Sequence, residues 1–276
     1  MCGIAGIVER DPARPVDLAE LDRMVETLRH RGPDDEGKLA QAGVGLGMRR
    51  LAIVDVDGGN QPFASEDGEI QLVANGEIYN HVSLREELIA KGHRFRSRSD
   101  IEVIVHGYEE FGVEVLARLR GMFAFVIWDA RRRLMLLARD RVGIKPLFYL
   151  EQPGLFAVAS ELQAFQALDE FQPTLDVQAI DMYLHYQYIP APLTIYLEVR
   201  KLSPAHYLVV NEDGTHGAPV RYWDVAFRPD RRCDEDGWVE RIDAALRETV
   251  STHLVSDVPF GAFLSGGIDS SSVLAY

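Results

Sequence analysis

Residues 121–140 carry the pattern that most restricts how this 276-residue chain can fold. After Gly121, two apolar runs, MFAFVIWD and LMLLARD, flank a short polar turn at Ala130-Arg131-Arg132. Two apolar runs joined by a short turn are typical of a β-hairpin. We therefore expect a buried hairpin in the middle of the chain, to which other strands can add.

The segments around this hairpin predict a layered sandwich of strands and helices. Leu18, Leu21, Val25 and Leu28 recur three and four residues apart, which indicates an amphipathic helix over 17–29. Ser99-Asp100 is expected to cap another helix over 101–110. The remaining expected elements are strands at 2–9, 44–48, 70–74, 147–150 and 155–159, a helix at 82–90 and a hairpin turn at 211–214.

The composition changes after about residue 225. The polar stretch 228–232 resembles a linker, and Asp234 or Asp236 is expected to cap a helix that ends near His253. An apolar strand VPFGAFL at 258–264, a glycine turn and the start of a helix at 268–276 follow. Because one strand and two helices cannot make a domain, we expect the beginning of a second domain and a natural protein longer than this chain.

The charge balance and the cysteines limit the classes of function. Asp and Glu outnumber Lys and Arg by 43 to 29, so the formal net charge is −14, which argues against nucleic acid or an anionic membrane as the main partner. No apolar run approaches the ~20 residues that span a bilayer, and the N-terminus lacks the features of a secretory signal. Cys2 and Cys233 make no disulfide framework, so we expect an enzyme of the reducing cytoplasm.

Cys2 is the first residue that suggests chemistry. Removal of Met1 would leave the Cys2 thiol beside a free α-amino group. The reference pKa values of that amine and thiol are about 7.7–8.0 and about 8.5, so the amine can act as the general base for its own side chain. The alternative is a small apolar residue buried in the first strand.

Three further polar groups suit an amino-acid ligand. Arg50 offers a planar fork to a carboxylate, and Asp100 offers an anion to an ammonium group. Asn75, through its side chain, and Gly76, through its backbone N–H, could together stabilise the oxyanion formed by attack on an amide. The alternatives are a surface charge at Arg50, a helix cap at Asp100 and an ordinary Asn-Gly turn.

The glycine turn at 264–271 lies between an expected strand and an expected helix. Glycines there allow backbone N–H groups to approach an anion, and the helix dipole favours negative charge. The turn is no Walker A loop because the Gly-Lys-Ser/Thr end is missing. Asp269 could hold Mg²⁺, whereas the alternative is a simple strand-to-helix connection.

The motifs in this order resemble the glutamine-dependent asparagine synthetases. They are MCGIAGI at 1–7, RHRGPDDEG at 29–37, RRLAIVD at 49–55, NGEIYNH at 75–81, SDIEVI at 99–104, GMFAFVIWD at 121–129, ARDRVGIKPLFY at 138–149 and VPFGAFLSGGIDSSSV at 258–273. The front motifs alone resemble class II glutamine amidotransferases in general. SGGIDSS adds the ATP-pyrophosphatase motif of the synthetase half.

The resemblance implies an α+β fold in two parts. Residues 2–225 would form a glutamine amidotransferase type 2 (glutaminase) domain, a four-layer αββα N-terminal-nucleophile sandwich. Residues 226–276 would form a linker and the first helix, strand and loop of an incomplete α/β adenine-nucleotide domain. In the family, the cysteine matched by Cys2 attacks the side-chain amide of glutamine and forms a glutamyl thioester, from which water releases glutamate.

Individual roles follow from the matched motifs. Cys2, Asn75 and Gly76 match the nucleophile and the oxyanion-hole pair, and Arg50 and Asp100 match the residues that hold the carboxylate and the ammonium of glutamine. Further matches to the glutamine pocket are Ile53, Val54 and Glu77. Matches to the nucleotide and pyrophosphate site are Leu264, Ser265, Gly266, Gly267, Asp269 and Ser270, with Asp269 also a candidate Mg²⁺ ligand.

The resemblance implies ATP-dependent synthesis of asparagine from aspartate, with ATP and Mg²⁺ serving the synthetase half and no cofactor needed for glutamine hydrolysis. One alternative is the same chemistry on another carboxylate acceptor, such as a sugar acid or a peptide. Another is a non-catalytic glutamine-binding module, which requires that Met1 remains. The expected partners are glutamine, ATP and aspartate or another acceptor, without nucleic acid or membrane, in a possible homodimer.

Overall fold

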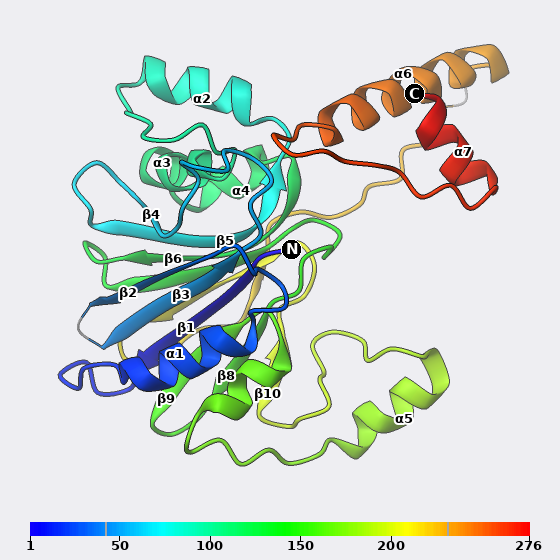
Figure 1. Cartoon of the computed structure of the whole chain (residues 1–276). Coiled ribbons are helices and arrows are strands. Elements are labelled where there is room, and N and C mark those ends of the chain that lie inside the picture. The colour runs from blue at the N-terminus through cyan, green and yellow to red at the C-terminus, as the bar shows by residue number, and fades with distance from the viewer. Residues whose placement is uncertain (42, 231) are drawn as a thin grey trace.

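Two six-stranded antiparallel sheets packed face to face form the body of the molecule, with helices on both outer faces (Figure 1). The computed structural model describes residues 1–41, 43–230 and 232–276. The first sheet has the order β10-β8-β9-β1-β3-β2, and the second has the order β12-β11-β7-β6-β5-β4. The expected four-layer αββα arrangement is therefore confirmed.

The first sheet is built around the N-terminal strand β1 (Gly3–Glu9), which is buried along its whole length. β1 pairs with β3 on one side, with Gly3 opposite Arg49, and with β9 on the other side, with Ala5 opposite Ala159. Its other strands are β2 (Asp35–Gln41), β3 (Val44–Arg50), β8 (Phe148–Glu151), β9 (Leu155–Ala159) and β10 (Val199–Lys201).

The expected hairpin forms the centre of the second sheet as β6 (Gly121–Asp129) and β7 (Leu134–Arg139). Val126 and Leu137 face the first sheet, whereas Phe125 and Leu136 pack beneath the helices, so both faces of the hairpin are buried. The other strands of the second sheet are β4 (Phe63–Ala64), β5 (Ile70–Ile78), β11 (His206–Asn211) and β12 (Val220–Arg221).

The helices divide between the two outer faces. α1 (Leu18–Thr27) packs on the first sheet, and its N-cap Asp17 accepts hydrogen bonds from the N–H groups of Ala19 and Glu20. α2 (His81–Ala90), α3 (Glu102–Phe111) and α4 (Val115–Arg118) cover the second sheet, with a short 3₁₀ turn at Gly112–Glu114. A second 3₁₀ turn (Leu162–Ala167) lies beside α1, and α5 (Val177–Tyr186) projects from the body on long loops.

The expected cap of the helix at 101–110 was wrong. The N-cap position of α3 is Ile101, and Ser99 Oγ accepts a hydrogen bond from the Ile101 N–H. Asp100 instead accepts a hydrogen bond from the Ile78 N–H in β5, at 2.6 Å. The carboxylate is used there because the edge of β5 carries a backbone donor that needs a partner.

Residues beyond the sandwich form two helices joined by an irregular segment. The expected cap at Asp234 is confirmed, since its side chain accepts from the Gly237 N–H at the start of α6 (Glu235–His253). Residues 228–230 and 232 of the expected linker belong to no helix or strand, and Arg231 lies outside the described residues. α7 (Ile268–Ala275) confirms the expected second helix.

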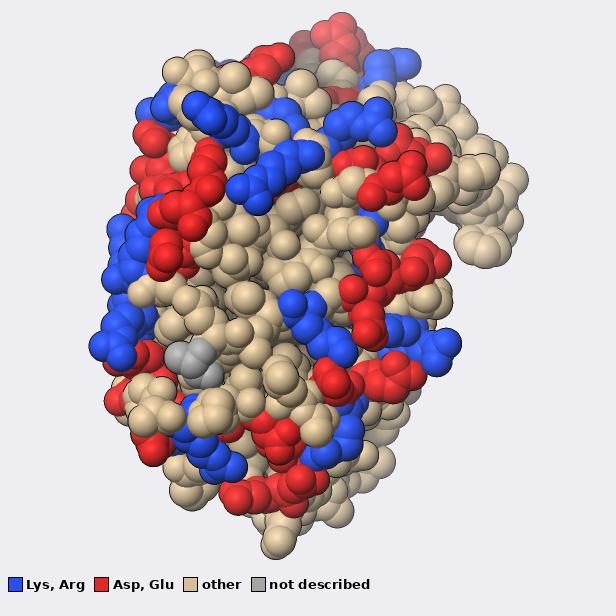
Figure 2. Space-filling view, turned by 60° about the vertical axis from the view of Figure 1, so that its left-hand side comes forward, with Lys and Arg blue, Asp and Glu red and all other residues tan. Residues whose placement is uncertain are grey.

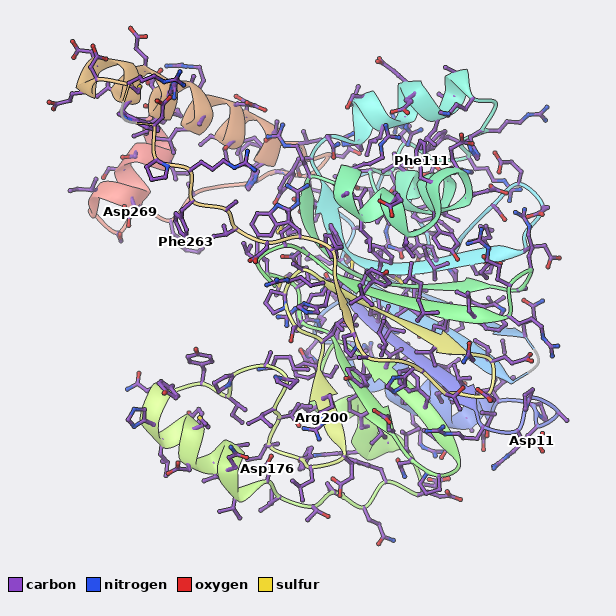
Figure 3. All side chains as sticks on the ribbon, turned by 180° about the vertical axis from the view of Figure 1, so that it is seen from behind. Asp11, Phe111, Asp176, Arg200, Phe263 and Asp269 are labelled. Carbon is purple, nitrogen blue, oxygen red and sulfur yellow. The ribbon has the colours of Figure 1, made fainter. Side chains whose placement is uncertain are left out.

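The strand expected at 258–264 was wrong. These residues are irregular because no described strand lies beside them to complete a backbone ladder, and residues 259–264 are exposed, with Phe263 fully so. In Figure 3, Phe263 and Asp269 lie with α6 and α7, away from the sandwich. Within the described ranges, no helix is long and apolar enough to cross a membrane.

The C-terminal segment touches the sandwich at one end of α6. The rings of His253 and Tyr79 stack 4.0 Å apart, and Glu248 pairs with Arg120 at 2.9 Å. Beyond the helix, the Asp257 N–H donates to the Ile53 carbonyl. Its carboxylate accepts from the Asp55 N–H at 2.6 Å.

The surface carries charges of both signs. Figure 2 shows acidic and basic side chains interspersed over the face that it presents. The charges on this face are therefore mixed and not gathered in a field of one sign.

Candidate active site at the start of β1

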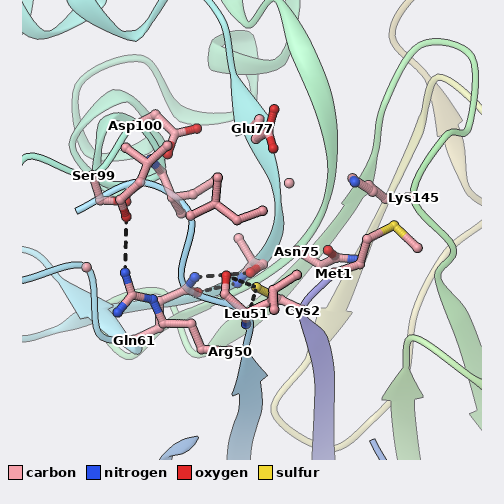
Figure 4. A pocket seen from close by; sticks show the side chains of 16 residues that line it. Met1, Cys2, Arg50, Leu51, Gln61, Asn75, Glu77, Ser99, Asp100 and Lys145 are labelled. Carbon is pink, nitrogen blue, oxygen red and sulfur yellow. Dashed lines mark hydrogen bonds between the residues drawn. The ribbon is translucent and has the colours of Figure 1, made fainter. Parts of the chain in front are cut away.

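A cavity opens where β1 begins, and it encloses about 530 Å³ including its mouth (Figure 4). All eight residues predicted for glutamine chemistry border it, although they span positions 2 to 100 of the sequence: Cys2, Arg50, Ile53, Val54, Asn75, Gly76, Glu77 and Asp100. The sequence analysis assigned no role to other lining residues, among them Leu51, Gln61 and Lys145. The fold thus brings the predicted glutamine residues together.

Hydrogen bonds to the backbone carbonyl and to the sulfur of Cys2 hold this residue in place. Arg31 Nε donates to the Cys2 carbonyl at 2.9 Å, and the Leu51 N–H lies 3.4 Å from Cys2 Sγ. Burial raises the pKa of the Cys2 thiol, while the Leu51 N–H and nearby positive charges oppose that rise. The thiol is therefore expected to need a base before it can attack.

The terminal amine lies close enough to influence this thiol. In the described chain it belongs to Met1, which also borders the cavity. Burial lowers the pKa of this amine, and a lowered pKa favours the neutral form that can accept a proton.

The free edge of β5 faces the cavity because β4 pairs only with Gln71 and Leu72. The side-chain amide of Gln61 replaces a strand there, accepting from the Ala74 N–H at 2.6 Å and donating to its carbonyl at 3.1 Å. The Ile78 N–H donates to Asp100. Backbone groups alternate along a strand, so the Gly76 N–H, between Ala74 and Ile78, points to the same edge and into the cavity.

Asn75 provides a second donor beside Cys2. Its side chain is 1% exposed, and its Nδ2 has no hydrogen-bond partner among the described residues. Asn75 alternates along β5 with residues that face the helices, so its amide faces the first sheet, where Cys2 immediately precedes β1. Buried donors nearly always have partners, and an oxyanion formed at Cys2 would supply one.

Arg50 uses its guanidinium differently from the expected fork. Its two terminal nitrogens donate to the carbonyls of Val54, Asp55 and Val56 and to Asn60 Oδ1, at 2.7–3.1 Å. Arg50 therefore shapes the loop that forms one wall of the cavity. The part of its fork available to a ligand carboxylate is small, and direct carboxylate binding remains a prediction.

One buried carboxylate, one half-buried carboxylate and one buried lysine give the cavity its charge. Burial raises the pKa of Asp100, and burial together with the Asp100 charge raises the pKa of Glu77. Lys145 is 5% exposed, and burial lowers the pKa of its ammonium, while Glu77 and Cys2 oppose that effect. The cavity thus combines acceptors for an ammonium group with a cation near the thiol.

Lys145 was missed by the sequence analysis, although its motif was recognised. The fully buried Asp140 carboxylate accepts hydrogen bonds from the N–H groups of Ile144 and Lys145, which fixes the loop carrying the lysine. A single lysine between Ile144 and the apolar run that starts at Pro146 is the signal that could have revealed a buried cation.

The residues predicted for the nucleotide form a separate group, and none of the six borders this cavity. Gly267 is the N-cap of α7, Gly266 has φ +80°, and Ser265 Oγ lies 2.9 Å from Ser270 Oγ. Asp269 lies in the first turn of α7, and Leu264 is exposed. The glycine turn therefore leads into a helix N-terminus, as predicted, although no strand precedes it.

An αββα sandwich with a cysteine immediately before its first strand is typical of the N-terminal-nucleophile amidotransferases, and this chain has that fold. The chain belongs to the glutamine amidotransferase domain family, whose model matches residues 1–223. The asparagine synthase family model matches residues 241–276.

Curated relatives match most or all of the chain. Asparagine synthetase (glutamine-hydrolyzing) 1 of Bacillus subtilis is 39% identical over the whole chain, which covers 43% of that protein. Amidase chyE of Penicillium rubens is 38% identical over 92% of this chain, which covers 38% of its length. The chain thus spans less than half the length of these curated relatives.

The solved structures support the fold. The structure of glutamine phosphoribosylpyrophosphate amidotransferase from B. subtilis matches 80% of this chain and 49% of its own, with a TM-score of 0.58 and 22% identity.

Proposed function

We propose that this chain hydrolyses glutamine through Cys2, exposed as the N-terminal residue by removal of Met1. The observation that carries this proposal is the buried Nδ2 of Asn75, which has no hydrogen-bond partner among the described residues, beside the edge-facing N–H of Gly76 in one cavity with Cys2. Two donors that converge near a nucleophile are the arrangement that stabilises a tetrahedral oxyanion.

The proposed steps balance without a cofactor. The α-amine of Cys2 takes the thiol proton, and Sγ bonds to the amide carbon of glutamine while Asn75 and Gly76 stabilise the oxygen. The proton then passes to the leaving nitrogen and the carbon–nitrogen bond breaks. Ammonia departs, and a glutamyl thioester remains on Cys2. Attack by water on the thioester releases glutamate and restores the thiol.

We assign the substrate contacts by charge. Asp100 and Glu77 would bind the ammonium of glutamine, and their position at the cavity wall supports this assignment. Arg50 would contribute positive charge to the carboxylate end, mainly through the loop that it organises. Ile53 and Val54 on the same loop would pack against the aliphatic part of the substrate.

We further propose that the longer protein transfers the ammonia to aspartate as a glutamine-hydrolysing asparagine synthetase. The support is the asparagine synthase match at 241–276 and the printed names of the similar B. subtilis proteins. Two cysteines that form no disulfide suit a reducing compartment, which supports the predicted cytoplasmic location. A homodimer remains a prediction.

The glycine turn fits the phosphates of a nucleotide. The free N–H groups at the start of α7 can bind an anion, and open space surrounds Gly266. Ser265, Gly266, Gly267 and Ser270 would contact pyrophosphate, Leu264 would lie beside the nucleotide, and Asp269 would hold Mg²⁺. When bound there, ATP supplies the adenylyl group that activates a carboxylate.

A different acceptor is the second candidate. Amidase chyE is about as similar to this chain as the asparagine synthetases are, so similarity in this region does not select aspartate. In the longer protein, asparagine formation from aspartate, ATP and glutamine supports the first candidate. Turnover of another carboxylate alone supports the second.

The glutaminase proposal is tested by glutamate and ammonia release from glutamine, with Cys2→Ala as the variant and intact mass as a check of Met1 removal. We expect release from the processed chain and none from the variant. Release that persists in Cys2→Ala would refute the nucleophile. Processed, folded protein that does not hydrolyse glutamine would refute the proposal, whereas protein that keeps Met1 and binds glutamine without hydrolysing it would support the binding-module alternative.

A further inference from the structure

Glu66, His93, His106 and Glu109 converge in the helical layer over the second sheet. Each offers one ligand atom, and the four atoms lie within 4.8 Å of one another. The residues come from three segments: Glu66 from the turn between β4 and β5, His93 from the loop after α2, and the other two from one face of α3. None of them borders the Cys2 cavity.

His106 is unusual for a buried histidine. Its side chain is 1% exposed, and neither ring nitrogen has a hydrogen-bond partner among the described residues. Glu109 Oε2 is likewise buried without a partner there. Because buried polar groups are normally satisfied, these atoms indicate a missing partner that bonds to nitrogen and oxygen together.

Three of the separations within this group suit a shared metal ion better than hydrogen bonds. His106 Nδ1 lies 3.4 Å from Glu66 Oε2, and His93 Nδ1 lies 3.4 Å from Glu66 Oε1 and 3.7 Å from Glu109 Oε2. Hydrogen bonds of this kind are about 2.7–3.2 Å long. Ligands about 2.0–2.2 Å from a tetrahedral zinc ion lie roughly 3.3–3.6 Å apart.

Charged groups lie behind three of the four ligands. His106 Nε2 faces Glu102 Oε1 at 3.6 Å, and His93 Nε2 faces Glu110 Oε2 at 3.6 Å, which leaves each Nδ1 free to bind a metal. Glu109 Oε1 accepts a hydrogen bond from Arg131 at 2.7 Å. Carboxylates behind metal-bound histidines are a regular feature of metal sites.

We propose that Glu66, His93, His106 and Glu109 bind one Zn²⁺ ion. Two neutral imidazoles and two carboxylates balance its charge, and this nitrogen–oxygen set in a tetrahedral arrangement suits zinc, whereas Mg²⁺ prefers six oxygens. An entry path exists, because Glu66, His93 and Glu109 line a surface depression.

The ion has a structural role in this proposal. It ties α3 to the loop after α2 and to the turn that leads into β5, the strand that carries Asn75 and Gly76. Because the site lies outside the Cys2 cavity, zinc stabilises the helical layer and takes no part in glutamine hydrolysis.

The test uses the full chain without a histidine tag, stripped with a chelator and titrated with Zn²⁺ or Mg²⁺ by calorimetry and thermal melting. We expect one Zn²⁺ per chain, a higher Tm with zinc, and no effect of Mg²⁺. Visible absorption of bound Co²⁺ reports the tetrahedral geometry. His93→Gln and Glu109→Gln are expected to weaken zinc binding more than the roughly 10–100-fold that loss of an outer partner costs.

His185→Gln is the matched control, since this exposed histidine lies on α5. It is expected to bind zinc as the unchanged chain does. The proposal is overturned if the folded chain binds no zinc, or if His93→Gln and Glu109→Gln bind it with unchanged affinity. Far-UV circular dichroism of each variant establishes that it is folded, so weakened binding is assigned to the lost ligand.

Discussion

Asn75 and Gly76 are neighbours on β5 but donate to the cavity through different groups, one by its side chain and one by its backbone. Asn75→Ala removes only the side-chain donor, because Asn75 is paired in the ladder opposite Ala124 through its backbone. We expect kcat for glutamine hydrolysis to fall by about 10²–10³-fold with little change in KM.

Steady-state kinetics measures this effect, and Asn211→Ala at the exposed end of β11 is the control that should keep normal kinetics. A kcat within threefold of the unchanged chain would remove Asn75 from the oxyanion hole.

Asp100 links substrate binding to pH. Its pKa in the folded chain is raised, mainly by burial, above the value of about 3.9 for an unperturbed aspartate. The folded state therefore holds the proton more tightly than the unfolded state, and the Asp100 contribution to stability decreases as pH rises through this window. Asp100→Asn is expected to raise KM for glutamine while keeping or increasing the Tm at neutral pH.

The Tm difference between Asp100→Asn and the unchanged chain should shrink in acid, where Asp100 itself becomes neutral. Thermal melts at several pH values check this trend. An unchanged KM would contradict the assigned contact with the ammonium of glutamine.

Lys145 places a positive charge near the Cys2 thiol, and this charge helps to lower the thiol pKa. Lys145→Met removes the charge but keeps an unbranched side chain. We expect the acid limb of the kcat/KM profile to move to higher pH, whereas Lys145→Arg should preserve its position. Equal pH profiles for the two variants would show that the charge at residue 145 has no influence on the nucleophile.

At the scale of elements, β5 and β6 approach too closely at Gly76 for any side chain. A Cβ there would lie 2.4 Å from the Met122 carbonyl oxygen and 2.8 Å from Phe123 Cα. Gly76→Ala must separate the strands, and we expect a loss of about 1–3 kcal/mol in the free energy of unfolding, together with loss of glutaminase activity.

Denaturant unfolding measures this loss. Gly217→Ala is the matched control, because a Cβ there meets open space. Equal stability of the two variants would mean that β5 and β6 adjust to a side chain at residue 76.

Local patterns predicted the elements whose stability is mostly local. The β6–β7 hairpin was predicted correctly, and so was Asp234 as one of two candidate caps, because each depends on residues close in sequence. The strand at 258–264 was wrong because apolar character alone cannot supply a pairing partner. The hydrogen bond from the Ala74 N–H to the Gln61 side chain, which takes the place of a neighbouring strand, was not predictable. It joins backbone and side-chain groups from separate segments of the sequence.

The site shows the same division between local and distant effects. Motifs indicated Cys2, Asn75 and Asp100, which the fold brings to one cavity. They could not indicate that loop oxygens occupy most of the Arg50 fork, because that geometry depends on how residues 54–60 turn back on β3.

At the scale of the whole molecule, the loop at 53–56 that borders the cavity is bonded to two segments. Asp257 of the C-terminal segment accepts from the Asp55 N–H, and Arg50 of β3 donates to the Asp55 carbonyl. Asp257→Ala is expected to raise KM for glutamine several-fold with a smaller effect on kcat. Asp181→Ala on the exposed face of α5 is the control. Kinetics of Asp257→Ala equal to those of the unchanged chain would show that the loop keeps its form without this contact.

The contact between Asp257 and the loop at 53–55 also has a thermodynamic consequence that runs in both directions. Any factor by which this contact strengthens glutamine binding must equal the factor by which glutamine strengthens the contact. Glutamine bound beside Cys2 would therefore stabilise the contact that residues 254–257 make with the loop. Slower hydrogen exchange at the Asp257 amide, on addition of glutamine to a Cys2→Ala chain, would show this coupling between the cavity and the C-terminal segment.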